Sequence, residues 1–401
     1  MTDPSRVMVL GSGFAGLWAA LAAARRLDEL GVTPGTVNVT MLSSTPYHDI
    51  RVRNYETDLS PSRISLSDLL DPVGIEHIAG EVTAIHASAR IVESTAGAHG
   101  YDRLILALGS QVVKPDIPGL GGFGFDIDTH DAAIKLQAHL RRLAEDPADP
   151  AAATVLVVGA GLTGIEAATG LPAMLADTFA AHALTPRVIL IDHNPFVGSD
   201  MGASARPIIE AALAETGVET MLGVAVAAID ERAVTLSSGE VLPAATVVWC
   251  AGMRANPLTA EFGVDRDRLG RLPVDDYLRV CGVPAVFAAG DVAAAKVDDA
   301  HMSVMSCQHG RPMGRFAGYN VVSDLLGKPM KPLRIPWYVT VLDLGPAGAV
   351  YTEGWDRHVV ACGEEAKNTK HTINTRRIYP PLTRDRDALL AAAAPELQAA
   401  P

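Results

Sequence analysis

The chain has 401 residues, of which 48% are hydrophobic and 20% charged, and its formal net charge at pH 7 is −13. This length exceeds what one hydrophobic core usually serves, so we expect two or three domains. The acidic balance argues against nucleic acid and anionic lipid as partners. Neither a membrane-spanning apolar run of ~18 residues nor a secretory signal is recognisable, so we expect a cytoplasmic protein.

The predicted elements open with a strand, a glycine-rich turn, a helix and a second strand. The first strand covers residues 6–10, the helix runs from about residue 14 to 30, and the second strand covers residues 36–42. A further strand at residues 101–110 runs into a glycine turn. The Pro- and Gly-rich segment 114–125 predicts an irregular crossover between domains, because both residue types disfavour regular elements.

The second half of the chain repeats this order. After a helix at residues 130–143, a strand at residues 155–158 enters a second glycine-rich turn and an Ala-rich helix, and the next strand covers residues 187–192. Two more strands that end in glycine turns and one long helix are expected at residues 246–252, 285–291 and 303–326.

The C-terminal region mixes strand-like runs from residue 335 onward with a basic stretch at residues 367–381. We expect this basic stretch to be a solvated face, and contact with an anionic acceptor or a cofactor phosphate is the alternative. Residues 382–401 predict a short helix and a loose tail. That tail lacks the broad apolar face and basic rim of a membrane anchor.

Each Gly-x-Gly-x-x-Gly turn predicts a dinucleotide site, because each follows a strand and opens a helix. The first glycine of such a turn makes the tight bend, the second lets the backbone approach a pyrophosphate, and the third lets helix and strand pack closely. The N-terminus of the helix adds free N–H groups and a positive dipole end. The two sets are Gly11, Gly13 and Gly16, and Gly159, Gly161 and Gly164.

The strand that follows each glycine turn distinguishes the two sites. Asp192 ends the strand of the second site, where a carboxylate accepts the ribose 2′-OH and repels a 2′-phosphate, so NADH is predicted over NADPH. Ser43 stands where the first site would carry the corresponding acid. Three alternatives stay open there: Ser43 binds the ribose weakly, the site is adapted to a different tail, or it holds its cofactor loosely.

The cysteines are widely scattered and form no C-x-x-C pair. Their spacing fits neither a zinc site nor a redox pair, so we expect reduced thiols and no metal. The four positions are Cys250, Cys281, Cys307 and Cys362.

Five motifs in chain order carry a resemblance to a known family: the two glycine turns, "LILALGS", "VVWCAGMRANPL" and "VFAAGD". Together they resemble the FAD/NAD(P)H oxidoreductases with two dinucleotide-binding folds, the pyridine nucleotide-disulfide oxidoreductase-like superfamily. Within it the chain is most similar to type II NADH dehydrogenases, the NADH:quinone reductases, over about residues 6–330. The resemblance implies an α/β fold with two Rossmann-like domains. The implied division is an FAD domain at residues 1–114 and 256–330, an NAD(H) domain at residues 115–255, and a C-terminal region and tail at residues 331–401.

The resemblance also implies roles for individual positions. Glu166 matches the acid that approaches the nicotinamide, although a first-turn acid favoured by the helix dipole is the alternative. Gln308 matches the residue that faces the acceptor side of the flavin, so these two are the expected catalytic residues. FAD would be held by Gly11, Gly13, Gly16, Ser43, Ala107, Gly109, Gly290 and Asp291, and NADH by Gly159, Gly161, Gly164 and Asp192.

The implied activity is that of an NAD(P)H:acceptor oxidoreductase, in which NADH gives a hydride to FAD and two electrons pass to an acceptor, expected to be a quinone. One alternative is a ferredoxin or rubredoxin reductase that docks its partner on a basic surface formed by Lys367, Lys370, Arg376 and Arg377. Another is a non-catalytic redox-sensing or binding protein. Peripheral contact with the inner face of the membrane and a homodimer also stay open.

Overall fold

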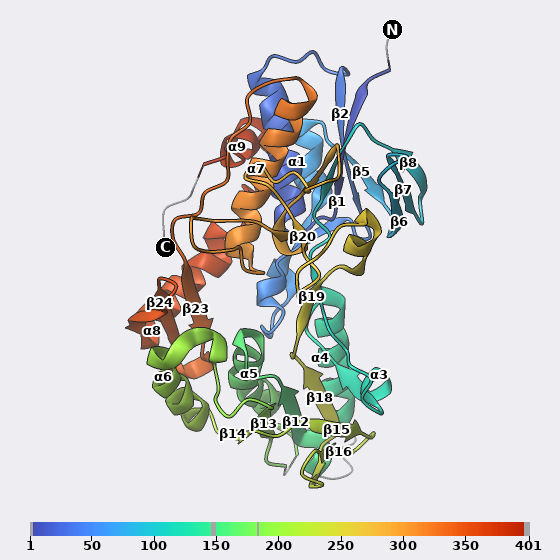
Figure 1. Cartoon of the computed structure of the whole chain (residues 1–401). Coiled ribbons are helices and arrows are strands. Elements are labelled where there is room, and N and C mark those ends of the chain that lie inside the picture. The colour runs from blue at the N-terminus through green and yellow to red at the C-terminus, as the bar shows by residue number, and fades with distance from the viewer. Residues whose placement is uncertain (1–2, 146–149, 183, 397–401) are drawn as a thin grey trace.

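The computed structural model of the chain describes residues 3–145, 150–182 and 184–396. Two five-stranded parallel sheets lie in separate lobes, at the top and bottom of Figure 1. The upper sheet has the order β21-β9-β1-β2-β5 with all neighbours parallel. Its strands are β1 (Ser5–Leu10), β2 (Val37–Ser43), β5 (Glu76–Ala79), β9 (Arg103–Leu106) and β21 (Val286–Ala288). The chain therefore returns to the first sheet after it has built the other lobe.

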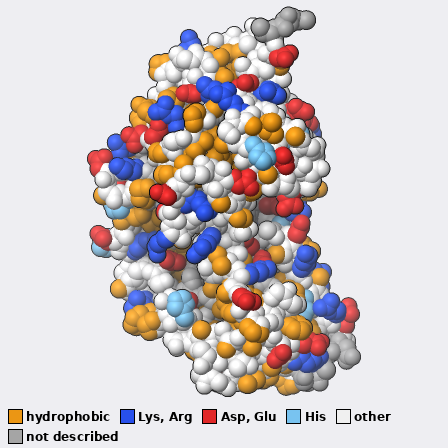
Figure 2. All heavy atoms as spheres, turned by 45° about the vertical axis from the view of Figure 1, so that its right-hand side comes forward, with side chains coloured by type: hydrophobic (Ala, Val, Ile, Leu, Met, Phe, Trp, Pro, Cys, Tyr) orange, Lys and Arg blue, Asp and Glu red, His pale blue; other side chains and the backbone are white. Residues whose placement is uncertain are grey.

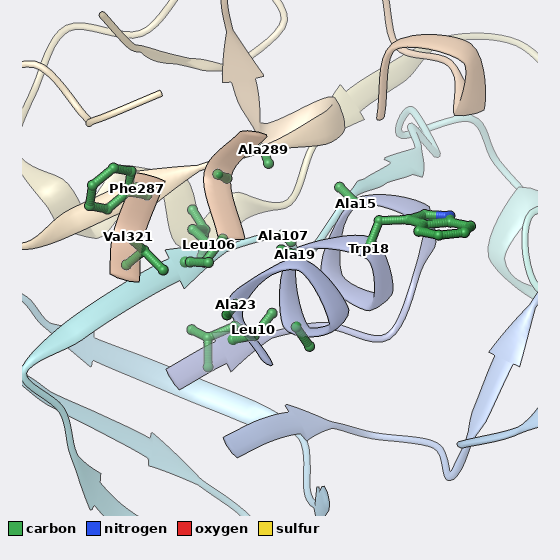
Figure 3. Packing of buried hydrophobic residues seen from close by; sticks show 14 of the residues in the cluster. Leu10, Ala15, Trp18, Ala19, Ala23, Leu106, Ala107, Phe287, Ala289 and Val321 are labelled. Carbon is green, nitrogen blue, oxygen red and sulfur yellow. The ribbon is translucent and has the colours of Figure 1, made fainter. Parts of the chain in front are cut away.

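Helices α1 (Phe14–Glu29) and α7 (Cys307–Leu325) pack side by side in the upper lobe (Figure 1). Two glycines of α7 permit the close approach. A Cβ added at Gly314 would lie 2.3 Å from the backbone oxygen of Ala15, and one at Gly318 would lie 2.0 Å from that of Ala19. Figure 3 shows these two alanines among the buried side chains of the upper core. Small residues spaced four apart thus set the distance between the two helices.

The lower sheet has the order β11-β18-β12-β13-β14, and its neighbours are also parallel. Its strands are β11 (Gly124–Phe125), β12 (Thr154–Val158), β13 (Arg187–Asp192), β14 (Val218–Leu222) and β18 (Thr246–Trp249). The helices of this lobe are α3 (Leu120–Phe123), α4 (His130–Glu145), α5 (Leu162–Thr178) and α6 (Gly202–Glu215).

The chain crosses between the lobes through β10 (Ser110–Val112) and β19 (Met253–Ala255), which pair antiparallel with each other. Both lobes also contain short antiparallel sheets. They are β3 (Tyr47–Asp49) with β4 (Arg63–Ser65), β6 (Val82–His86) with β7 (Ile91–Ser94) and β8 (Gly97–Gly100), and β15 (Val226–Ile229) with β16 (Ala233–Leu236) and β17 (Val241–Pro243). The upper lobe also holds α2 (Leu66–Leu70) and the parallel pair β20 (Leu272–Pro273) and β22 (Ala293–Ala294).

The C-terminal region forms a third unit, on the left of Figure 1. An antiparallel sheet of β23 (Val339–Asp343), β24 (Ala349–Glu353) and β25 (His358–Cys362) packs against α8 (Gly363–Thr372). A π-helical turn at Ile373–Arg377 and helix α9 (Arg386–Ala392) follow. Strand β23 also contacts α5 of the lower lobe, and α9 contacts α1 of the upper lobe, so this region touches both nucleotide-binding units. Within the described residues, every helix is too short or too polar to span a bilayer.

The α/β class and the repeated strand–turn–helix units are confirmed, and two sequence predictions are wrong. Segment 114–125 is not irregular throughout, because it contains α3 and β11, and pairing of β11 with β18 supplies backbone hydrogen bonds that outweigh the local glycine content. The basic stretch 367–381 is not a continuous solvated face, because Lys370 and Asn374 are buried while Arg376 and Arg377 are exposed. Residues 397–401 of the predicted tail lie outside the described residues.

Candidate nucleotide sites and an adjoining apolar pocket

The first glycine turn has the geometry that a close backbone approach requires. Gly11 adopts φ +97°, and a Cβ there would lie 2.5 Å from the backbone oxygen of Ala107. A Cβ at Gly16 would lie 1.9 Å from the backbone oxygen of Gly11, so helix and strand touch at this point. Gly13 differs, because a Cβ there would meet nothing within 4 Å in the described part of the chain. Room for a ligand therefore lies beside Gly13, at the uncapped N-terminus of α1.

A cavity of about 360 Å³ opens beside this turn. Its lining combines backbone N–H groups of the glycine turn with polar side chains, a donor set that suits the phosphates and riboses of a dinucleotide. Of the predicted FAD residues, the lining includes Gly11, Gly13, Ser43, Ala107 and Gly109. It also includes Arg51, Glu81 and Asp128, which sequence reasoning missed.

Ser43 lies at the carboxyl end of β2, where the prediction placed it, and it is buried. Its hydroxyl donates to the backbone oxygen of Thr45 at 2.8 Å and lies 2.9 Å from Nε2 of His77. Glu81 follows the neighbouring strand β5 and supplies a carboxylate to the same cavity. The sequence signal that could have identified Glu81 is an acidic residue just after the strand that pairs with β2.

Asp291 sits in a short helical turn at Gly290–Val292, at the end of β21. Its Oδ2 accepts a 2.6 Å hydrogen bond from the hydroxyl of Ser110, and Arg51 Nη1 lies 4.0 Å away. Burial raises the pKa of Asp291, with the hydrogen bond from Ser110 opposing that effect. Arg51 also forms an ion pair with Asp128, so it bridges two carboxylates at the mouth of the crossover between the lobes.

The second glycine turn repeats the geometry of the first. Gly159 adopts φ +107°, and a Cβ at Gly164 would lie 1.7 Å from its backbone oxygen. Gly161 has more space, since a Cβ added there would lie 3.4 Å from a side-chain oxygen of Asp200. Asp192 ends β13, and its two carboxylate oxygens accept backbone hydrogen bonds from the residues at 160 and 194, at 2.6 and 2.7 Å. The carboxylate therefore lies directly against the turn.

Glu166, one of the two expected catalytic residues, is buried in α5. Its Oε1 accepts a 2.6 Å hydrogen bond from Lys370 Nζ and a 3.1 Å hydrogen bond from the backbone of Asp343. Burial raises the pKa of Glu166, and the positive charge of Lys370 opposes that effect. Sequence reasoning assigned Lys370 to a solvated face. The ion pair is what makes burial of its ammonium group tolerable.

An apolar pocket of about 190 Å³ lies where the N-terminal half of α7, the start of α5 and the C-terminal region meet. Leu162, which lies between Gly161 and Gly164 of the second glycine turn, lines one side, and Lys370 lines another. Gln308, the second expected catalytic residue, also lines it. Other lining residues are Val52, Ser306, Cys307, Arg311, Pro312, Arg315, Ile335, Trp337, Tyr338, Val339, Thr340, Val341, Ile373, Asn374, Arg377 and Ile378.

The amide of Gln308 is fixed by the backbone of the C-terminal sheet. Its Nε2 donates to the oxygen of Val339 at 2.7 Å, and its Oε1 accepts from the nitrogen of Val339 at 3.2 Å. The pocket thereby joins the two expected catalytic residues: Gln308 lines it directly, and Glu166 reaches it through Lys370.

Two further side chains near the start of α7, those of His309 and Cys307, are explained by a hydrogen bond and by burial. Nδ1 of His309 accepts a 2.8 Å hydrogen bond from the backbone of Val304, and burial lowers the pKa of His309 to about 4. Burial raises the pKa of the Cys307 thiol, which favours an unreactive packing role over redox chemistry.

The family model of the pyridine nucleotide-disulphide oxidoreductases matches residues 5–314 of this chain. An NADH dehydrogenase-like protein of Mycobacterium tuberculosis is 67% identical over 399 residues, which cover 99% of this chain and 100% of that protein. The demethylphylloquinone reductase of Synechocystis is 28% identical over 368 residues, covering 87% of each chain. Among solved structures, NDH2 of Plasmodium falciparum superimposes with a TM-score of 0.78 at 13% identity, over 97% of both chains, and so shares the fold.

Proposed function

This chain belongs to the pyridine nucleotide-disulphide oxidoreductase family, and from that premise we propose that it is an NADH:quinone oxidoreductase that uses FAD. The family match and the relatives support an NADH dehydrogenase-like oxidoreductase of the FAD- and NAD(P)H-using family. The quinone acceptor, the preference for NADH and the roles of individual residues are the proposal.

One observation carries the proposed acceptor: an apolar pocket is lined by Leu162, which lies within the second glycine turn, and by Gln308. An electron acceptor must come close to the site of hydride transfer, and a quinone ring needs a largely apolar enclosure with few polar groups. Trp337 and Tyr338 give the pocket aromatic walls, and Ile335 adds an aliphatic one. A flat, apolar ring matches this lining.

The proposed division of labour follows from the positions of the two turns. The open room at Gly13 and the N-terminus of α1 would hold the FAD pyrophosphate, with Ser43 or Glu81 on the ribose. The turn at Gly161 would hold NADH, and Asp192 would accept its ribose hydroxyl and exclude a 2′-phosphate. When bound, FAD would supply the redox chemistry, by taking a hydride from NADH and passing two electrons onward.

Glu166 and Lys370 would supply protons to a quinone in the pocket. Reduction of a quinone consumes two protons with its two electrons, so a proton donor must face the ring. Lys370 lines the pocket, and its Nζ also donates to the backbone oxygen of Val341 at 3.0 Å. Nearby carboxylates raise the pKa of Lys370 against the effect of burial, so the ammonium form holds a proton at this wall.

The structure weakens the case for a small iron–sulfur protein as the acceptor. Lys370 cannot contribute to the basic docking surface expected for that partner, because it is buried. The charge of Lys367 is offset by Asp343, whose Oδ1 lies 2.5 Å from Lys367 Nζ. Arg376 and Arg377 remain exposed. On the face shown in Figure 2, acidic and basic side chains are interspersed. Such a surface provides little electrostatic steering toward an acidic protein.

Anaerobic stopped-flow absorbance tests the proposal. NADH should bleach the visible band of the flavin bound to the purified protein, and a soluble quinone should then restore it. NADPH should bleach the band at least about tenfold more slowly at equal concentration, because Asp192 disfavours a 2′-phosphate. Fast bleaching that no quinone reverses would refute the acceptor, while a colourless protein that takes up no FAD would refute the whole assignment.

A further inference from the structure

Two arginines of α7 bury their guanidinium groups without a counter-ion among the residues that the structure describes. Arg311 is 7% exposed and Arg315 is 3% exposed. The Nε atoms of both lack a hydrogen-bond partner, and within the described residues neither side chain forms an ion pair. Glu396, which is exposed, acts on Arg315 only at longer range. Buried charges in proteins are normally paired, so these two guanidinium groups form a candidate anion-binding site.

Burial has the electrostatic effect expected for unpaired cations. It lowers the pKa of Arg311 to about 10 and that of Arg315 to about 9. The two guanidinium carbons lie 5.3 and 4.2 Å from the ring centroid of Trp18, so cation–π contacts hold them in place. Such contacts do not replace a counter-ion, because the ring carries no net charge.

Both arginines line the apolar pocket. They stand four residues apart on α7, and Gln308 stands one turn before Arg311, so all three side chains share one face of the helix. Arg377 adds an exposed cation to the lining. Neither Arg311 nor Arg315 belongs to the lining of the cavity beside the first glycine turn. Both guanidinium groups adjoin the apolar pocket, where an anionic group on its occupant would supply the counter-charge.

We propose that this pocket takes a planar quinone that carries an anionic ring substituent, a carboxylate in the simplest case, and that Arg311 and Arg315 bind the anion while Trp337 and Tyr338 contact the ring. This inference rests on the proposed quinone reductase activity. The reaction balances as NADH, one proton and the quinone giving NAD⁺ and the hydroquinone, and the anionic substituent is unchanged.

Paired acceptors and paired variants test the inference. Steady-state NADH oxidation is measured with 2-methyl-1,4-naphthoquinone, which is neutral, and with 1,4-naphthoquinone-2-sulfonate, which is anionic. Arg315→Met should lower kcat/KM for the sulfonate by about 10- to 100-fold more than kcat/KM for the neutral ring, the value of a charge-assisted hydrogen bond. Arg315→Lys should recover part of the loss, and the exposed Arg334→Met is the matched control.

The ratio of kcat/KM between the two acceptors is compared between variants, so the contribution of their different redox potentials cancels. Flavin content and the rate of bleaching by NADH should stay within about twofold of the unmodified protein in Arg315→Met and Arg311→Met. An equal fall for both quinones would overturn anion recognition. Loss of FAD from either variant would overturn it too, because the arginines would then serve the cofactor.

A binding measurement separates failure of this inference from failure of the quinone assignment. Naphthalene-2-carboxylate cannot accept electrons, and calorimetric titration into the oxidised holoenzyme should show binding that Arg315→Met weakens at least about tenfold. This result would support the anion subsite even if no quinone were reduced. No binding to the unmodified protein would overturn the subsite. Tighter binding of dodecanoate than of naphthalene-2-carboxylate would overturn the planar ring, because the pocket would then suit an acyl chain.

Discussion

Replacing Lys370 by methionine would leave the buried carboxylate of Glu166 without its cation. Removing one partner of a buried ion pair typically costs about 3–5 kcal/mol. Protonation of the carboxylate limits this loss of folding free energy, because it removes the unpaired charge. At pH 7 that route costs about 3.7 kcal/mol, since pH 7 is about 2.7 units above the unfolded pKa of about 4.3 and each unit is worth about 1.36 kcal/mol. We therefore expect Lys370→Met to lower the free energy of unfolding by about 3–4 kcal/mol at pH 7.

The loss should depend on pH in a definite direction. Burial raises the pKa of Glu166 in the folded protein, and removing Lys370 removes the effect that opposes it. A group whose folded pKa is raised favours the folded state below its unfolded pKa, and that contribution is lost as the pH rises toward the folded pKa. At pH 5.5 the protonation route costs only about 1.6 kcal/mol. The penalty of the variant should therefore shrink by about 2 kcal/mol between pH 7 and pH 5.5.

Urea denaturation followed by circular dichroism at pH 5.5, 7 and 8 measures this effect. The reference is the double variant Glu166→Gln with Lys370→Met, whose neutral side chains remove the titration and should recover stability at pH 7. Lys135→Met, an exposed lysine of α4, is the control and should change the free energy of unfolding by less than about 0.5 kcal/mol. A penalty that is the same at every pH, or a double variant no more stable than Lys370→Met, would refute the reasoning.

Four further variants follow from the glycine geometry and the ribose acid. Gly13→Ala should fold with near-native stability but bind FAD at least about tenfold more weakly. Gly16→Ala should lower the melting temperature, because its Cβ would lie 1.9 Å from a backbone oxygen. Flavin absorbance measures the first effect and thermal denaturation the second. Asp192→Ala with His193→Arg should move the ratio of kcat/KM for NADPH over NADH upward by about 100-fold, and an unchanged ratio would show that the acid does not meet the ribose. Gly318→Ala should cost at least about 2 kcal/mol in urea denaturation, because its methyl would lie 2.0 Å from a backbone oxygen of α1, and a variant of native stability would mean that the two helices can separate freely.

The fold was predictable where structure is local. A short apolar run, a glycine turn and an amphipathic segment specify a strand–turn–helix unit without reference to distant residues, and both units formed as expected. The glycines of α7 were not recognised, because Gly314 and Gly318 acquire meaning only when α1 lies against them. Segment 114–125 was misjudged for the same reason, since its strand exists through pairing with β18.

The apolar pocket shows why the acceptor is harder to predict than the nucleotides. A glycine turn concentrates its function in a few consecutive residues, but the pocket is assembled from segments as distant as Val52, Leu162 and Tyr338. Lys370 has no sequence signal, because a lysine in a basic stretch resembles a solvated one until Glu166 is placed against it. The C-terminal region contributes the wall that the two nucleotide-binding units lack. Relatives that share both glycine turns can therefore differ in acceptor through this region together with the start of α7, and exchanging residues 306–315 together with residues 331–396 between two such relatives should transfer acceptor preference while the preference for NADH stays with the recipient.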